Sequence, residues 1–162
     1  MTTTPPTDWL IVDGNNLLHC HPELADLARR NFDHARRALV EQLSALGVVL
    51  ARRITVVFDG TRGGHGEGFE GAAVEVLFSP AHLTADAVIE RLVHAAPAPD
   101  TITVVSSDRL ERDTVEAAGA TSLSCRNFVE RLATEQRRLR QSQGRPPGPR
   151  PAPGTLGDYF PG

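Results

Sequence analysis

The sequence predicts an α/β protein whose central sheet is mainly parallel, has about five strands and carries helices on both faces. Short, continuous runs of apolar and β-branched residues recur along the chain, which is typical of strands covered on both sides. Between most of these runs, apolar residues recur at the three- and four-residue spacing of a helix. This alternation favours parallel strands joined by helical crossovers.

The first half of the chain supplies three of the strands and one long helix. Strands are predicted over residues 9–12, 54–58 and 74–78, which are short and mostly apolar. A helix is predicted over residues 33–46, because Ala35, Leu39, Leu43 and Leu46 fall on one helical face.

The second half supplies two strands and three helices. Strands are predicted over residues 102–105 and 121–124, and a helix over 85–93, where Ala85, Ile89 and Val93 share a face. Further helices are predicted over 108–118, which Gly119 is placed to stop, and over 127–141.

The chain has room for one globular domain, which we place at residues 1–142. Residues 144–162 contain five Gly and six Pro, so residues 143–162 are predicted to form a flexible Pro/Gly-rich tail. Cys20 and Cys125 are far apart in sequence, and the apolar run at 9–12 is too short for a signal or a membrane span. A cytoplasmic protein with no membrane partner is expected, and its oligomeric state is left open.

Charge divides the chain into an acidic body and a basic end. Residues 1–125 carry ten Arg and 17 acids, whereas residues 126–162 carry seven Arg and three acids.

Three weaker motifs favour ordinary structure over chemistry. Residues 66–71 match the dinucleotide pattern G-x-G-x-x-G, but a strand follows them where the motif needs a helix, so a surface loop is predicted for this stretch, which includes His65. His19, Cys20 and His21 lack the partners of a metal site and are interpreted as loop. No G-x-S-x-G is present, and no nucleophile has a convincing His and acid pair.

Acidic residues carry the strongest functional signal. Asp13, Asp59 and Asp108 each come at or just after the end of a predicted strand. Because parallel strands end at the same sheet edge, the three acids are expected to converge there. Each also has a structural explanation: Asp13 and Asp59 suit turns before Gly, and Asp108 suits an N-cap, with Glu111 completing a capping box.

Asp86 and Glu90 lie one helical turn apart and join this set. A like-charged pair at this spacing is unfavourable unless a cation relieves it, although Asp86 also suits the first turn of a helix. Crowded carboxylates select hard oxygen-loving cations, so Mg²⁺ or Mn²⁺ is the predicted cofactor. The corresponding chemistry is metal-assisted phosphodiester hydrolysis.

Four blocks of the sequence resemble, in order and spacing, those of the YacP-like NYN domains of the PIN-like nuclease superfamily. They lie at residues 12–16 (VDGNN), 57–60 (VFDG), 84–92 (TADAVIERL) and 104–109 (VVSSDR). The resemblance spans roughly residues 9–141 and implies a Rossmann-like PIN fold with metal-dependent endoribonuclease activity, acting in mRNA decay on the ribosome. Asn15 departs from the family pattern, which often has an aromatic or aliphatic residue there.

The resemblance also implies roles for individual residues. Asp13, Asp86 and Asp108 would be the catalytic and metal-binding acids, supported by Asp59 and Glu90. Asn16 would orient the Asp13 loop or a phosphate. Ser107, Arg36 and Arg109 would contact RNA phosphate.

We therefore expect a metal-dependent endoribonuclease with RNA as its partner. The basic end is predicted to hold RNA, above all through Arg137, Arg138 and Arg140, because an acidic catalytic edge repels a polyanion. The alternative is an RNA-binding or scaffold module of the same fold with a weak or vestigial metal site. A small-molecule phosphatase or nucleotide-binding domain lacks its expected motifs.

Overall fold

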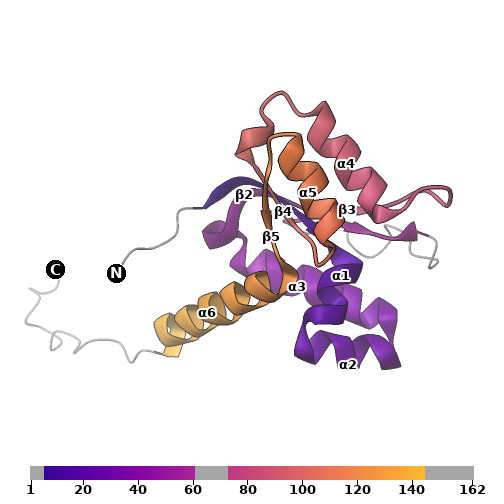
Figure 1. The fold of residues 1–162 in the computed structure, drawn as a ribbon. Coiled ribbons are helices and arrows are strands. Elements are labelled where there is room, and N and C mark those ends of the chain that lie inside the picture. Colours follow the sequence, from indigo (N-terminus) through magenta and orange to yellow (C-terminus); the bar gives the residue numbers. More distant parts are fainter. Residues whose placement is uncertain (1–5, 61–72, 145–162) are drawn as a thin grey trace, which may run out of the picture.

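The computed structural model describes residues 6–60 and 73–144, and it confirms the predicted α/β architecture (Figure 1). One parallel sheet has the strand order β3-β2-β1-β4-β5. Its strands are β1 (Thr7–Asp13), β2 (Ala51–Phe58), β3 (Glu75–Phe78), β4 (Ile102–Val105) and β5 (Thr121–Leu123). The helices are α1 (Gly14–Cys20), α2 (Pro22–Arg30), α3 (Phe32–Leu50), α4 (Ala85–Ala95), α5 (Arg109–Ala117) and α6 (Cys125–Gly144), with a 3-10 turn at Pro99–Thr101.

The strand order places a switch point beside β1. The chain first builds outward from β1 through β2 to β3, then returns to place β4 and β5 on the other side of β1. In open α/β sheets, ligands bind outside the carboxyl ends of the strands where the order reverses. The edge between β1 and β4 is therefore the first place to look for a site.

Two hydrophobic cores cover the faces of the sheet. The larger one packs α1, α2, α3 and α6 against side chains such as Leu10, Val12 and Val56. The smaller one packs α4 and α5 against Ile11, Val57, Val104 and their neighbours (Figure 1). Alternate residues of β1 thus face opposite cores, and Asp13 shares the α4 and α5 side with Ile11 because side chains alternate along a strand.

The stretch from 14 to 30 differs from the prediction. His19 and Cys20 end α1, and His21 is the N-cap of α2, where its Nδ1 accepts a hydrogen bond from the backbone N–H of Leu24 at 3.4 Å. The loop interpretation is wrong for His19 and Cys20, whereas His21 is the single residue that connects the two helices. A seven-residue helix beginning with Gly and Asn has little local propensity and depends on packing, which buries Leu17 and Leu18 completely.

Other boundaries move by only a few residues. α3 continues past its predicted end to Leu50, α6 extends at both ends, and β4 has the predicted bounds. The Gly-rich stretch 61–72 with His65, and residues 145–162 of the predicted tail, lie outside the described residues. No helix in the described ranges is long and apolar enough to cross a membrane.

Candidate metal centre

Three carboxylates meet at the carboxyl edge of the sheet beside the switch point. Asp13 ends β1, Asp86 lies in the first turn of α4 and Glu111 in the first turn of α5. One carboxylate oxygen from each lies within 4.8 Å of the others. We call these three residues the acid cluster.

Asp13 is held by the strand and the helix that it joins. It is the last residue of β1 and the N-cap of α1, and its Oδ1 accepts a hydrogen bond from the backbone N–H of Asn16 at 3.1 Å. Its side chain is completely buried, and Oδ2 has no hydrogen-bond partner in the described part of the chain. A buried carboxylate oxygen without a donor is costly unless it holds a proton or a cation.

Glu111 has a similar environment. It is 3% exposed, and its Oε2 accepts a hydrogen bond from the Ser106 hydroxyl at 2.6 Å. Its Oε1 is buried and, among the described residues, has no hydrogen-bond partner. Among the described residues, the acid cluster thus contains two buried carboxylate oxygens with no donor other than the protons that the neighbouring carboxyl groups can hold.

The electrostatics follow from this burial. Desolvation, with the neighbouring charge of Asp86, raises the pKa of Asp13 from 3.8 to about 7. Desolvation, with the charges of Asp13 and Asp86, raises the pKa of Glu111 from 4.5 to about 9. When no cation neutralises them, Glu111 therefore stays protonated at neutral pH, whereas Asp13 begins to lose its proton there.

The acid cluster suits a hard divalent cation. Its donors are all carboxylate oxygens, the ligands preferred by Mg²⁺ and Mn²⁺, and the two buried oxygens described above are available for ligation. Asp86 is half-buried, which leaves one side of the cluster nearer to solvent.

Asp108 lies outside the acid cluster and takes the N-cap position predicted as the structural explanation for it. It is the N-cap of α5, where its Oδ1 accepts hydrogen bonds from the backbone N–H groups of Leu110 at 2.9 Å and Glu111 at 3.5 Å. The structure thus brings Glu111, one turn further on, next to Asp13 and Asp86. This corrects the geometry of the predicted acid set, because the Asp108 carboxylate is turned to the helix end.

Asp59 and Glu90 lie near the acid cluster without being part of it. The backbone N–H of Asp59 donates to Asn15 Oδ1 at 2.8 Å, which fastens the end of β2 to the start of α1. This contact gives Asn15, the departure from the family pattern, a structural task that an apolar side chain cannot perform. Glu90 is half-buried, one turn beyond Asp86 on α4. Their supporting roles stay predictions.

A polar network joins α1 to the turn after β4. Asn16 Oδ1 accepts hydrogen bonds from the Ser107 hydroxyl at 2.5 Å and the Ser107 backbone N–H at 3.0 Å. It also lies 3.2 Å from the Ser106 hydroxyl, whose hydrogen is donated to Glu111 at 2.6 Å. Since the Ser107 backbone N–H donates to Oδ1, the other end of the amide, Nδ2, is a donor that points elsewhere. A hydroxyl has a single hydrogen, so Ser107 cannot donate to a phosphate while it donates to Asn16.

Sequence comparison agrees with this architecture. The sequence profile of the YacP-like NYN domain family matches residues 10–150. The chain belongs to the YacP-like NYN domain family. The match covers every described strand except the first residues of β1, and it confirms the resemblance seen in the four sequence blocks.

Relatives of known sequence or structure support the same assignment. YacP of Bacillus subtilis (strain 168) is 33% identical over 137 residues, a match that covers 82% of this chain and 79% of that protein. The crystal structure of Rae1 (YacP) from Bacillus subtilis superposes with a TM-score of 0.74 at 31% identity, covering 85% of this chain and 80% of that one. A point mutant of Rae1 gives a TM-score of 0.68 and covers 86% of each chain.

Arg36 is buried in this NYN domain. Its guanidinium lies over the rings of Phe32, Phe58 and Phe78, at 5.0, 6.0 and 5.5 Å from their centroids, and its Nη2 contacts Asp33 at 3.1 Å. The residue is 5% exposed, and Nε and Nη1 are buried without hydrogen-bond partners in the described part of the chain. The predicted phosphate contact does not fit this burial, and Arg36 instead packs α3 against the ends of β2 and β3.

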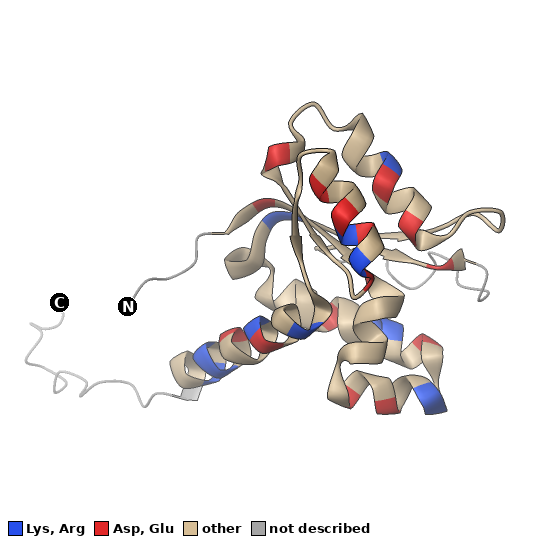
Figure 2. Cartoon of the chain, viewed as in Figure 1, with Lys and Arg blue, Asp and Glu red and all other residues tan. Residues whose placement is uncertain are grey.

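The other predicted RNA-binding arginines are exposed. Arg109 opens α5 beside Asp108, near the acid cluster. Arg137, Arg138 and Arg140 lie towards the far end of α6, which extends away from the sheet (Figure 2). At about 1.5 Å per residue, Arg137 lies roughly 18 Å along the helix from Cys125. The structure does not bring these three arginines to the acid cluster.

Two residues of the candidate site were missed in the sequence, Glu111 and Ser106. Glu111 occupies the same buried face of α5 as Val115, four residues later. A glutamate at an apolar position of an amphipathic helix is a detectable signal, but the capping box offered a simpler explanation for it. Ser106 lies inside the block VVSSDR and has no individual signal.

Proposed function

We propose that this NYN domain is a metal-dependent endoribonuclease that hydrolyses phosphodiester bonds of RNA. The observation that carries the proposal is the acid cluster at the switch point of the sheet, where two buried carboxylate oxygens have no donor in the described part of the chain except the cluster's own acid protons. Asp13, Asp86 and Glu111 would hold Mg²⁺ or Mn²⁺. When bound, such an ion neutralises charge on the attacked phosphate and lowers the pKa of a bound water.

The residues around the acid cluster provide binding and orientation. Asn16 presents its amide Nδ2 as a donor whose direction is fixed by the two hydrogen bonds that Ser107 donates to Oδ1. This donor suits a phosphate oxygen better than the Ser107 hydroxyl, whose hydrogen is already used. Asp108 and Ser106 fix the start of α5 and hence the position of Glu111.

Cleavage of a labelled single-stranded RNA, followed with added Mg²⁺ or Mn²⁺ and with excess EDTA, tests the proposal. Cleavage is expected only with the metal, and Asp13→Asn is expected to abolish it. Circular dichroism and melting of Asp13→Asn check that the fold is retained. Full activity in EDTA contradicts the metal mechanism, whereas RNA binding without any cleavage supports the alternative of an RNA-binding module.

The family resemblance extends the proposal to messenger RNA on the ribosome. Co-sedimentation of the full chain with ribosomes, compared with the free protein at the same salt concentration, tests this extension separately from the chemistry.

A further inference from the structure

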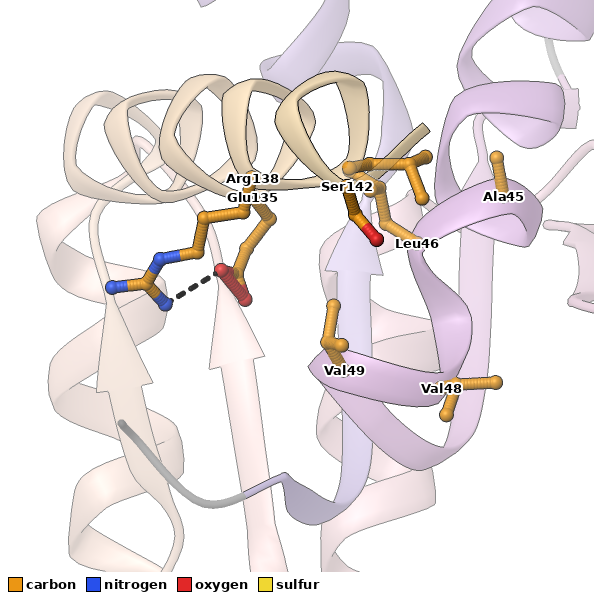
Figure 3. A pocket seen from close by; sticks show the side chains of 8 residues that line it. Ala45, Leu46, Val48, Val49, Glu135, Arg138 and Ser142 are labelled. Atoms are coloured by element: carbon orange, nitrogen blue, oxygen red, sulfur yellow. Dashed lines mark hydrogen bonds and ion pairs between the residues drawn. The ribbon is translucent and has the colours of Figure 1, made fainter. Parts of the chain in front are cut away.

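An apolar groove lies between the end of α3 and the last turns of α6 (Figure 3). It encloses about 450 Å³, and its apolar lining includes Leu46, Val48, Val49 and Leu139. Val48 is 90% exposed, Val49 43% and Leu139 36%. Large apolar side chains gathered in one exposed hollow indicate an interaction surface. We call it the α3–α6 groove.

The α3–α6 groove is separate from the acid cluster. α3 ends at Leu50, and β2 begins at the next residue, so the groove lies towards the amino ends of the strands. The acid cluster lies at the carboxyl ends. A ligand bound at the acid cluster therefore would not cover the apolar side chains of the α3–α6 groove.

The rim of the groove is polar and carries arginine. Arg138 Nη1 contacts Glu135 Oε1 at 2.9 Å across one edge, as Figure 3 shows, and Ser142 lies at the end nearest the helix terminus. Arg137 and Arg140 are also exposed on this part of α6. Because Arg138 is paired with Glu135 and the groove lining does not include Arg137 or Arg140, the matching ligand is a short apolar segment.

This chain contains such a segment close by. Residues 155–160 read TLGDYF and combine Leu156, Tyr159 and Phe160 with one acid, Asp158, and no basic residue. The large apolar side chains are spaced three and four residues apart, so one turn of helix or a compact turn brings them to one side. The segment complements the apolar floor of the groove.

The connecting chain is long enough. The described chain ends at Gly144, two residues after Ser142 in the last turn of α6. Twelve residue steps separate Gly144 from Leu156 and span up to about 37 Å at ~3.1 Å per residue. The groove extends along α6 from Glu135 to Ser142, about 10 Å at ~1.5 Å per residue. A segment tethered at this distance has an effective concentration on the order of millimolar, which favours docking within one chain.

From these observations we infer that residues 155–160 dock in the α3–α6 groove of their own chain. Docking covers Val48, Val49 and Leu139. The inference does not depend on the proposed nuclease activity.

Amide spectra of the uniformly ¹⁵N-labelled full chain test the docking. The compared variant replaces Leu156, Tyr159 and Phe160 by Ser, changes that lie outside the described fold and leave it intact. The amide shifts of Val48, Val49 and Leu139 are expected to change, while those of α4 and α5 stay constant. Unchanged shifts at the groove overturn the inference.

Limited chymotrypsin cleavage of the full chain gives an independent measurement. With Val48→Asp, cleavage after Tyr159 is expected to accelerate about tenfold, the ratio for a segment docked nine-tenths of the time. The matched control is Leu110→Asp, since Leu110 is 74% exposed on α5, away from the groove. Equal rates in wild type and Val48→Asp overturn the inference. The inference is also overturned if light scattering shows a dimer of the wild type and a monomer of Val48→Asp, because a second copy of the chain then occupies the groove.

Discussion

Glu111 is a carboxylic acid on the buried face of an amphipathic helix, and its environment explains both its raised pKa and its place in the candidate site. Ser106 satisfies one oxygen and leaves the other available next to Asp13 and Asp86. A glutamate in this position costs stability unless a proton or a cation compensates its charge. The loss of stability from burying the Glu111 carboxylate is therefore consistent with a requirement for this residue in metal binding.

Replacing Glu111 by Gln is expected to reduce RNA cleavage at saturating substrate by about 100-fold or more, because a ligand of the proposed metal is lost. The matched control is Asp108→Asn, since Asn caps a helix as well as Asp does and leaves the acid cluster intact. Kinetics with a defined RNA, together with thermal melting of both variants, provide the measurement. Equal loss of activity in the two variants would indicate that Asp108 is also a ligand of the proposed metal.

The raised pKa of Glu111 also predicts how stability depends on pH without metal. The folded chain holds a proton on Glu111 up to about pH 9, whereas the unfolded chain releases it near pH 4.5. The folded state therefore binds more protons between these values, and stability falls as the pH rises. Between pH 7 and 9 the free energy of unfolding is expected to drop by up to about 1.4 kcal/mol per pH unit.

Urea titrations in EDTA at pH 7, 8 and 9 measure this slope. Glu111→Gln should flatten it, because the amide does not titrate, and Mg²⁺ should offset it in the wild type. A wild-type slope that Glu111→Gln leaves unchanged would assign the pH dependence to another group.

At the scale of elements, the strands and the long helices could be predicted because their patterns are local. β4 was predicted with its observed bounds from the run ITVV, and α4 from apolar residues that recur at helical spacing. α1 has no such pattern, since its sequence GNNLLHC is short and polar at its start. α2 carried usable signals that were overlooked, with Pro22 in the first turn and two arginines in the last.

Of the three strand-end acids expected to converge, Asp13 belongs to the acid cluster, whereas Asp59 and Asp108 do not; Asp86, singled out on its helix, also belongs to it. The identity of the third acid was not predicted, since Asp108 and Glu111 are separated by less than one helical turn. The N-cap decides which of the two carboxylates is buried. Asp108 Oδ1 accepts hydrogen bonds from backbone N–H groups at the start of α5, and the Glu111 side chain lies on the buried face of the helix. Capping geometry of this kind depends on the entry of the chain from β4, which sequence spacing does not specify.

The burial of Arg36 in α3 predicts a structural role that mutation separates from RNA contact. Arg36→Met keeps a long side chain among Phe32, Phe58 and Phe78 and removes a buried charge, so stability should change by less than about 1 kcal/mol. Arg36→Ala removes the packing as well and should cost roughly 2–4 kcal/mol. Urea denaturation measures both, and RNA binding by Arg36→Met should equal that of the wild type. If Arg36→Met binds RNA more weakly than the wild type while its stability is unchanged, the predicted contact between Arg36 and RNA phosphate would be supported.

At the scale of the whole molecule, the acid cluster and the arginines of α6 occupy different regions. Figure 2 shows basic residues along α6, which extends away from the sheet. Arg137 lies roughly 18 Å along α6 from Cys125, the first residue of that helix. An RNA that contacts both the acid cluster and these arginines must therefore extend over several nucleotides. RNA affinity and RNA cleavage are thus expected to be separable by mutation.

Changing Arg137, Arg138 and Arg140 together to Gln is expected to weaken RNA binding while cleavage at saturating RNA persists. Each lost phosphate contact should reduce the log–log salt slope of single-strand binding by about 0.7. The matched control changes three exposed arginines with the same loss of charge, Arg29, Arg30 and Arg37. Fluorescence anisotropy at several salt concentrations measures the slopes. Equal effects from both triple variants would attribute the change to net charge alone.

Gly14 connects the aromatic packing of the larger core to the acid cluster. A Cβ at this position would lie 2.4 Å from the Phe58 ring and 2.9 Å from Val56, and Phe58 also packs against Arg36. One added methyl group would therefore displace the start of α1, and with it Asp13 and Asn16 on either side. Mutational tolerance around the site is consequently asymmetric: the carboxylates accept isosteric amides without rearrangement, whereas residue 14 accepts no side chain. A variant screen for folded but inactive protein should recover changes at Asp13 or Glu111 and find that changes at Gly14 also lower stability.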